Sequence, residues 1–137
     1  MKSGDTLIRL AKHKVDSVQK LILAAEQTRA GVLQKRDDLM AKSERERANA
    51  ARDPSIMGNW IAYAKVVAAQ NANLEASLAG IDHQLEALRG DLQVAFEEQK
   101  KFEMLEERRL ARVKQSKDKR AQAFMDEMAL VRASRVA

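Results

Sequence analysis

The amino-acid sequence predicts an all-α protein: a long two-helix antiparallel coiled-coil hairpin with a longer second helix. Ala, Leu, Glu, Lys, Arg and Gln dominate the 137 residues, which include a single Pro, a composition typical of long helices. Two stretches carry apolar residues at heptad spacing, and one Pro-containing segment separates them. We therefore expect a single domain over residues 1–137, with a helix at about 4–52, a turn at about 53–59 and a helix at about 60–134.

The first helix is predicted from a heptad pattern that begins at Ile8, taken as position a. Eight of the ten a and d positions up to Leu39 are apolar, which is typical of a coiled-coil seam. Ser3 or Asp5 is suited to cap the start of this helix. The seam positions are Ile8, Ala11, Val15, Val18, Ile22, Ala25, Arg29, Val32, Arg36 and Leu39.

The turn is predicted where the only Pro, Pro54, is followed by the pair Gly58-Asn59. Proline inside a helix removes a backbone hydrogen bond and clashes with the preceding turn, so this is the one strong break in the chain. Asp53, Ser55 and Asn59 are each plausible N-caps for the second helix, and the sequence does not choose among them.

The second helix has a longer seam, which loses its apolar character after Phe102. Beyond that residue the seam positions become Glu106, Arg109, Val113, Ser116 and Arg120, so the end of this helix is expected to extend past the first helix. The seam up to that point consists of Trp60, Ala64, Val67, Asn71, Leu74, Leu78, Ile81, Leu85, Leu88, Leu92, Ala95, Gln99 and Phe102.

The two seams can be placed opposite each other, because facing residues in an antiparallel pair have numbers with a constant sum. A sum of 110 centres the turn on Ser55 and sets Trp60 against Ala50. A sum of 117 keeps the same phase but sets Ile8 against Arg109, so we prefer 110 and keep 117 as the alternative.

The net charge also changes sign between the predicted first arm, the second arm and the end of the chain. Residues 1–52 have a net charge of +5, residues 53–107 of −6 and residues 108–137 of +6. A basic arm and an acidic arm suit each other as partners, whereas the basic end has no partner in the chain.

No catalytic, cofactor or metal motif accompanies these helices. There is no Cys, His13 and His83 fall on outer positions, and no phosphate-binding loop, nucleophile elbow or zinc-binding helix motif is present. We expect no enzymatic activity, cofactor, metal or small-molecule substrate. Since no run of about 20 apolar residues could span a bilayer and no secretory signal is evident, we expect a cytoplasmic protein.

Two regions are candidates for contacts with partners. Near the turn, Trp60 is suited to plug the hairpin tip, while Tyr63 flanks the seam and is the better candidate for a partner contact. At the other end, seven basic residues lie within 13 positions: Arg108, Arg109, Arg112, Lys114, Lys117, Lys119 and Arg120.

This basic run has three interpretations: a solvated helix end, a surface for an acidic protein, or a nucleic-acid surface. Stacking aromatics are nearly absent, which argues against single-stranded nucleic acid. An apolar stripe, Phe124, Met125, Met128 and Val131, follows the run. It suits either adaptable protein docking or incidental packing.

The sequence resembles the FliJ family, the small coiled-coil component of the flagellar type III export apparatus. The resemblance covers nearly the whole chain. It rests on Trp60-x-x-Tyr63, on the leucine-rich seam between Leu74 and Leu92, and on residues 101–109, KFEMLEERR, which are similar to the family segment K-x-L-E-x-L-x-E-R-R. The chain departs from the family in its many alanines and in the segment from Phe124 onward.

The resemblance implies a hairpin like the stalk subunit of rotary ATPases, located at the cytoplasmic face of the inner membrane. The implied partners are the hexameric export ATPase, the export-gate membrane protein and export chaperones. The implied ATPase-end residues are Arg108, Arg109, Arg112 and Lys114. The implied gate-facing residues, with Tyr63 added from its position, are Trp60, Tyr63, Ala64, Val67 and Asn71.

The expected function is therefore a non-enzymatic stalk or coupling component that links the export ATPase to the export gate. The injectisome counterpart is a close alternative. A nucleic-acid-associated coiled coil and a homodimeric scaffold that uses the Phe124–Val131 stripe are alternatives from other classes.

Overall fold

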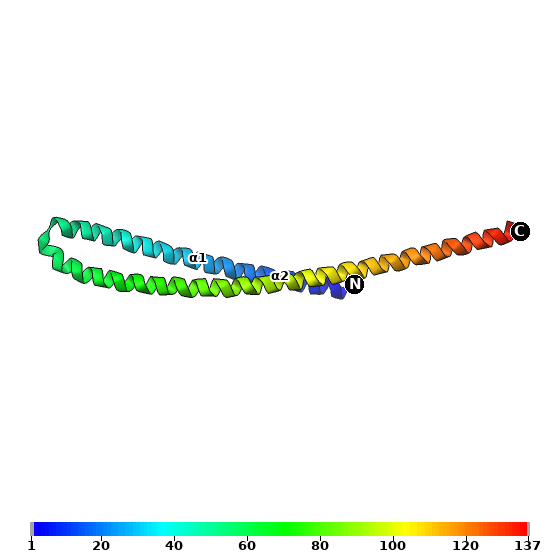
Figure 1. Cartoon of the computed structure of the whole chain (residues 1–137), viewed down its shortest axis with the longest axis horizontal. Coiled ribbons are helices and arrows are strands. Elements are labelled where there is room, and N and C mark those ends of the chain that lie inside the picture. Colours follow the sequence, from blue (N-terminus) through cyan, green and yellow to red (C-terminus); the bar gives the residue numbers. More distant parts are fainter. Residues whose placement is uncertain (1, 137) are drawn as a thin grey trace. The chain divides into compact units, whose positions relative to one another are not determined.

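The computed structural model describes residues 2–136, which form two helices and a short connection (Figure 1). Helix α1 spans Lys2–Arg52, the 3-10 helix η1 spans Pro54–Ile56, and α2 spans Met57–Val136. The described residues contain no strand, so the predicted all-α class with a longer second helix is confirmed. Contacts divide the chain into two compact units, residues 16–94 and residues 1–15 with 95–137.

Asp53 caps the connection between the helices. Its backbone is extended, and its Oδ1 accepts hydrogen bonds from the Ser55 backbone N at 3.0 Å and the Ser55 hydroxyl at 2.7 Å. Pro54 takes the first helical position, where a missing N–H costs nothing. Asp53 therefore caps η1 and not α2 itself, which begins at Met57, so that Gly58 and Asn59 lie inside it.

The start of α1 differs from the expected capping arrangement. The helix begins at Lys2, so Ser3 and Asp5 lie in its first turn and not at the capping position. Asp5 is acidic and therefore complements the positive end of the helix dipole there.

The unit of residues 16–94 has its core along the predicted seam. Every predicted seam position of α1 and α2 within this unit is buried or half-buried. Leu85 is only 2% exposed and is set opposite the small residue Ala25 when facing numbers add to 110. The six buried side chains are Val18, Ala25, Ala50, Val67, Leu78 and Leu85.

The Arg29–Asp82 ion pair across this seam agrees with the register in which facing numbers add to 110, whereas Glu26–Arg89, with a sum of 115, does not distinguish 110 from 117. Arg29 Nε donates to Asp82 Oδ1 at 2.7 Å, and Arg89 lies 3.7 Å from Glu26. In the alternative register Arg29 would face residue 88, and Asp82 would lie about six residues, or about 9 Å along the helix, from that level. The sum of 110 therefore describes the pairing in this unit.

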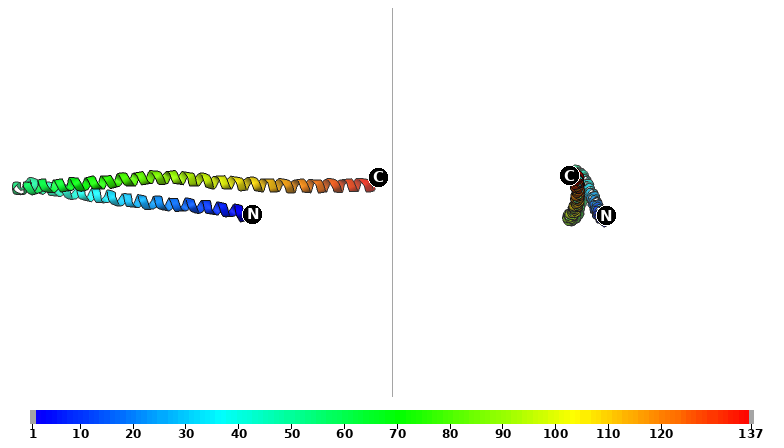
Figure 2. Two further views of the ribbon diagram at one scale, coloured as in Figure 1. Left: turned by 90° about the horizontal axis from the view of Figure 1, so that it is seen from below. Right: turned by 90° about the vertical axis from the view of Figure 1, so that its right-hand side faces the viewer.

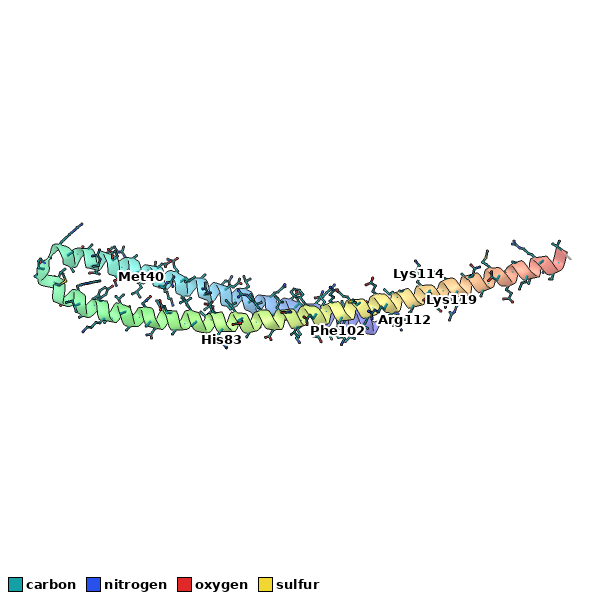
Figure 3. All side chains as sticks on the ribbon, in the orientation of Figure 1. Met40, His83, Phe102, Arg112, Lys114 and Lys119 are labelled. Atoms are coloured by element: carbon teal, nitrogen blue, oxygen red, sulfur yellow. The ribbon has the colours of Figure 1, made fainter. Side chains whose placement is uncertain are left out.

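The unit of residues 1–15 with 95–137 contains the end of the paired region. Ala11, Val15 and Ala95 are buried here, Lys14 lies 3.7 Å from Glu98, and Phe102 is half-buried (Figure 3). From Leu110 to Val136 every residue is exposed, and this part of α2, the C-terminal extension, continues beyond the start of α1 (Figure 2).

Replacing Leu85 by Ala should remove buried apolar contacts at the best-packed seam position. We expect the free energy of unfolding to fall by about 2 kcal/mol or more, measured by urea denaturation followed by circular dichroism. Leu23→Ala, at an exposed position of α1, is the control and should change it by less than about 0.5 kcal/mol. Equal effects would contradict the seam assignment.

Replacing Asp53 by Ala should lower the melting temperature at neutral pH, because the cap of η1 is lost. The Ser55 hydroxyl and then its backbone N–H hold the pKa of Asp53 below its ordinary value. A carboxyl with a lowered pKa stabilises the fold fully above about pH 4 and loses this effect as the pH falls through its folded-state pKa. The difference in melting temperature between wild type and Asp53→Ala should therefore shrink in acid. Asp53→Asn, which keeps a capping oxygen, should lose less at neutral pH.

Candidate partner-binding surfaces

The tip of the hairpin carries the chain's Trp and Tyr side by side. The ring centroids of Trp60 and Tyr63 are 5.9 Å apart with a tilt of 47°, and both residues are half-buried. Both line a shallow groove of about 310 Å³ together with Ala50, which is 2% exposed. The arrangement agrees with Trp60 as a plug of the tip, and it places Tyr63 beside Trp60 with part of its ring accessible.

The other residues expected to face the export gate lie in the seam. Val67 is buried, and Ala64 and Asn71 are half-buried at positions that face α1. They are therefore held between the two helices in this structure. The apolar side chains that point outward near the turn are Met57, Ile61 and Val66. The heptad pattern could not single them out, because an isolated apolar residue off the seam is common on protein surfaces.

Asn71 is a polar residue at a seam position, and its amide group is only partly hydrogen-bonded. Its Nδ2 lies 3.5 Å from Glu75 Oε1 on the same helix, while its Oδ1 is buried without a hydrogen-bond partner. A buried polar atom left in this state costs about 1–3 kcal/mol. In the 110 register Asn71 lies opposite the apolar Leu39, which offers no donor.

At the other end of the paired region, Arg109 forms a close ion pair with Glu106 one helical turn earlier. Arg109 Nη2 donates to Glu106 Oε1 at 2.6 Å, and Nε lies 3.1 Å from Oε2. The Glu106 side chain is only 13% exposed. The hydrogen bond from Arg109 lowers the pKa of Glu106 and raises that of Arg109.

Gly4 of α1 provides the space that this ion pair occupies. A Cβ built on Gly4 would collide with the Glu106 carboxylate. The missing side chain therefore lets Glu106 lie against α1 while it holds the Arg109 guanidinium.

The four basic residues expected at the ATPase end therefore separate into two kinds. Arg108, Arg112 and Lys114 are exposed, whereas Arg109 is held by Glu106 and half-buried. Figure 3 shows Arg112 and Lys114 on the part of α2 near the start of α1, and Lys119 further along. The accessible charge continues over residues 110–120.

The apolar stripe of the C-terminal extension is exposed and lies on its own side of α2. Phe124, Met128 and Val131 are each one residue after the positions at which the seam would continue, 123, 127 and 130. One residue corresponds to about 100° around a helix. The stripe is therefore turned away from the line that α1 follows on α2.

The described part of the chain holds neither a metal-binding cluster nor a membrane-spanning helix. No three His, Asp or Glu side chains among residues 2–136 come together as metal ligands would, and His83 is exposed (Figure 3). Within the same residues, no helix is both long and apolar enough to cross a bilayer.

These features define the class of the molecule as a coiled-coil hairpin with an exposed basic extension. A family model described as "Flagellar FliJ protein" matches residues 5–137. The chain belongs to the FliJ family, as its sequence resemblance predicted. Searches of curated proteins and of solved structures found no match.

Membership gives the chain a role related to flagellar protein export, in a family that is a non-catalytic component of that system. The match therefore favours the flagellar system over the injectisome alternative. Neither the expected partners nor their contact residues follow from the family match, and they remain predictions.

Replacing Glu106 by Ala should release the Arg109 guanidinium. We expect its modification by an arginine-selective reagent such as phenylglyoxal to speed up relative to Arg112, measured by peptide mass spectrometry. Glu103→Ala, which removes an exposed carboxylate from the same helix, should leave the ratio unchanged. An unchanged ratio in Glu106→Ala would show that this ion pair does not protect Arg109.

Proposed function

We propose that this protein is the non-enzymatic stalk or coupling component of flagellar type III export. It links the export ATPase ring to the export gate at the cytoplasmic face of the inner membrane, with export chaperones as a further partner. The observation that carries the proposal is the exposed basic extension of α2, residues 110–136, in a chain of the FliJ family.

The extension is the surface that we assign to the ATPase. A net charge of +6 over residues 108–137 would speed encounter with an acidic surface. Arg112 and Lys114 offer exposed cations at its start, and the exposed Arg108 lies just before it. Arg109 belongs to this end as well, but its ion pair with Glu106 must open before it can bind a partner.

The hairpin tip is the surface that we assign to the gate. Trp60 and Tyr63 are partly accessible there and form a rigid aromatic pair, the kind of side chain that is enriched at interface hot spots. Ala64, Val67 and Asn71 complete the assigned set but face α1, so a direct contact with them requires a change in the pairing.

The combined substitution of Arg112→Glu and Lys114→Glu tests the ATPase assignment without disturbing the ion pair of Arg109. We expect the dissociation constant for the purified export ATPase to rise about tenfold or more, the equivalent of about 1.4 kcal/mol. The melting temperature should stay unchanged, because both side chains are exposed.

The matched control reverses the same number of charges on α1, at the exposed residues Lys20 and Lys42. It should leave ATPase binding close to wild type. Equal weakening by both pairs would show a non-specific charge effect, and no weakening by the first pair would remove the extension as the ATPase surface.

A further inference from the structure

The half of the hairpin nearest the turn is the poorly matched part of the seam. In the 110 register, Arg36 faces Leu74 and Ser43 faces Val67. Glu46 is opposite Ala64 and is exposed, as it would not be in a well-packed seam. Further from the turn most facing pairs are apolar on both sides, as in Val32 with Leu78, Ala25 with Leu85 and Ile22 with Leu88, and Arg29 opposite Ile81 is the exception.

Polar contacts between the helices follow the same division. Arg29–Asp82 and Glu26–Arg89 cross the seam in the well-matched part. Nearer the turn, over residues 34–52 and 57–76, the described hydrogen bonds and ion pairs of the helices stay within one helix, as in Arg47–Glu44. The described contacts that hold the two helices together in this half are therefore apolar.

The surface of α1 in this half is exposed apart from the half-buried Arg36, Leu39 and Ser43 and the buried Ala50, which lies beside Trp60 at the turn. Of residues 40–49 only Ser43 is half-buried, and a groove of about 360 Å³ runs beside Leu39 and Leu74. Little apolar area therefore opposes separation of this stretch of α1 from α2. Local opening is favoured where buried apolar contacts are few.

The seam face of α2 in this half carries more large apolar residues than the stretch of α1 that covers it. Trp60, Val67 and Leu74 supply apolar seam positions, and Val67 is 6% exposed. Between Val67 and Leu74, the buried Oδ1 of Asn71 is an acceptor without a donor. Leu39 of α1 cannot satisfy it, whereas a helix with an amide or amine at that level could.

We propose that the seam face of α2 from Trp60 to Leu74 is a second binding surface, covered at rest by a poorly matched stretch of α1. It takes an amphipathic helix from a partner protein that is apolar at the seam positions and carries a hydrogen-bond donor opposite Asn71. The turn-proximal part of α1 separates to admit that helix. A link between this surface and the export gate rests on the proposed function, but the surface itself does not.

The opening can be measured by hydrogen exchange on the whole chain. We expect amides in residues 36–52 and 60–74 to exchange faster than those in 16–32 and 78–92. Asn71→Leu removes the unsatisfied acceptor and should slow exchange in the turn-proximal half, whereas Ala72→Leu at the exposed neighbouring position should not. Uniform exchange across both halves would overturn the proposal.

Binding can be tested with a defined probe. The probe is a fluorescent peptide of residues 33–52 with Arg36→Leu, Ser43→Leu and Glu46→Leu, made with Gln or with Leu at position 39. The Gln peptide should bind wild type several-fold more tightly than the Leu peptide, and Asn71→Leu should reverse this preference. No binding, or no reversal, would contradict the assigned surface.

An engineered disulfide that locks α1 onto α2 tests whether the peptide binds at this surface or elsewhere. The sequence has no Cys, so only the engineered pair can form a disulfide. In the variant Ser43→Cys with Val67→Cys, oxidation should abolish peptide binding and reduction should restore it. The control Ala25→Cys with Leu85→Cys closes the seam outside the proposed surface, and its oxidation should leave binding intact. If the peptide results hold but oxidation at 43 and 67 does not affect binding of the purified gate protein, the link to the gate fails and the surface stands.

Discussion

The structure depends on one constraint, which is that the buried seam residues of α1 must meet seam residues of α2 that leave room for them. The 110 register satisfies it by setting Ala25 against Leu85 and Ala50 against Trp60. The buried apolar residues among residues 4–136 all lie along this seam, so a shifted pairing would disturb the whole core. The position of the turn follows from this register, since Asp53 and Pro54 lie just before its centre at residue 55.

Sequence periodicity was sufficient for the seam because it reports a property repeated over many residues. Thus Val18, Leu78 and Leu85 are buried as the heptads predict. Sequence periodicity could not predict that Asp53 caps the connection between the helices. Three residues there have capping side chains, and only the extended backbone of one of them, with its hydrogen bonds to Ser55, decides among them.

The candidate site was predictable as a region but not as a set of accessible side chains. The sequence located the basic run, yet it could not show that Glu106 would hold Arg109 over Gly4. It also assigned Val67 and Asn71 to a partner while it placed them in the seam. Rotamers and single hydrogen bonds settle such questions, and periodicity contains no information about them. The same features distinguish the exposed residues 110–136 from the seam residues Val67 and Asn71, which α1 covers.

The displacement of the Phe124–Val131 stripe by one residue has a consequence for assembly. A helix that packed on this stripe would approach α2 from a side different from the one that α1 occupies along the seam. A neighbour held there would not compete with intramolecular pairing in the same unit. The free energy of binding this neighbour would then add to the free energy of pairing α1 with α2, whichever of the two forms first.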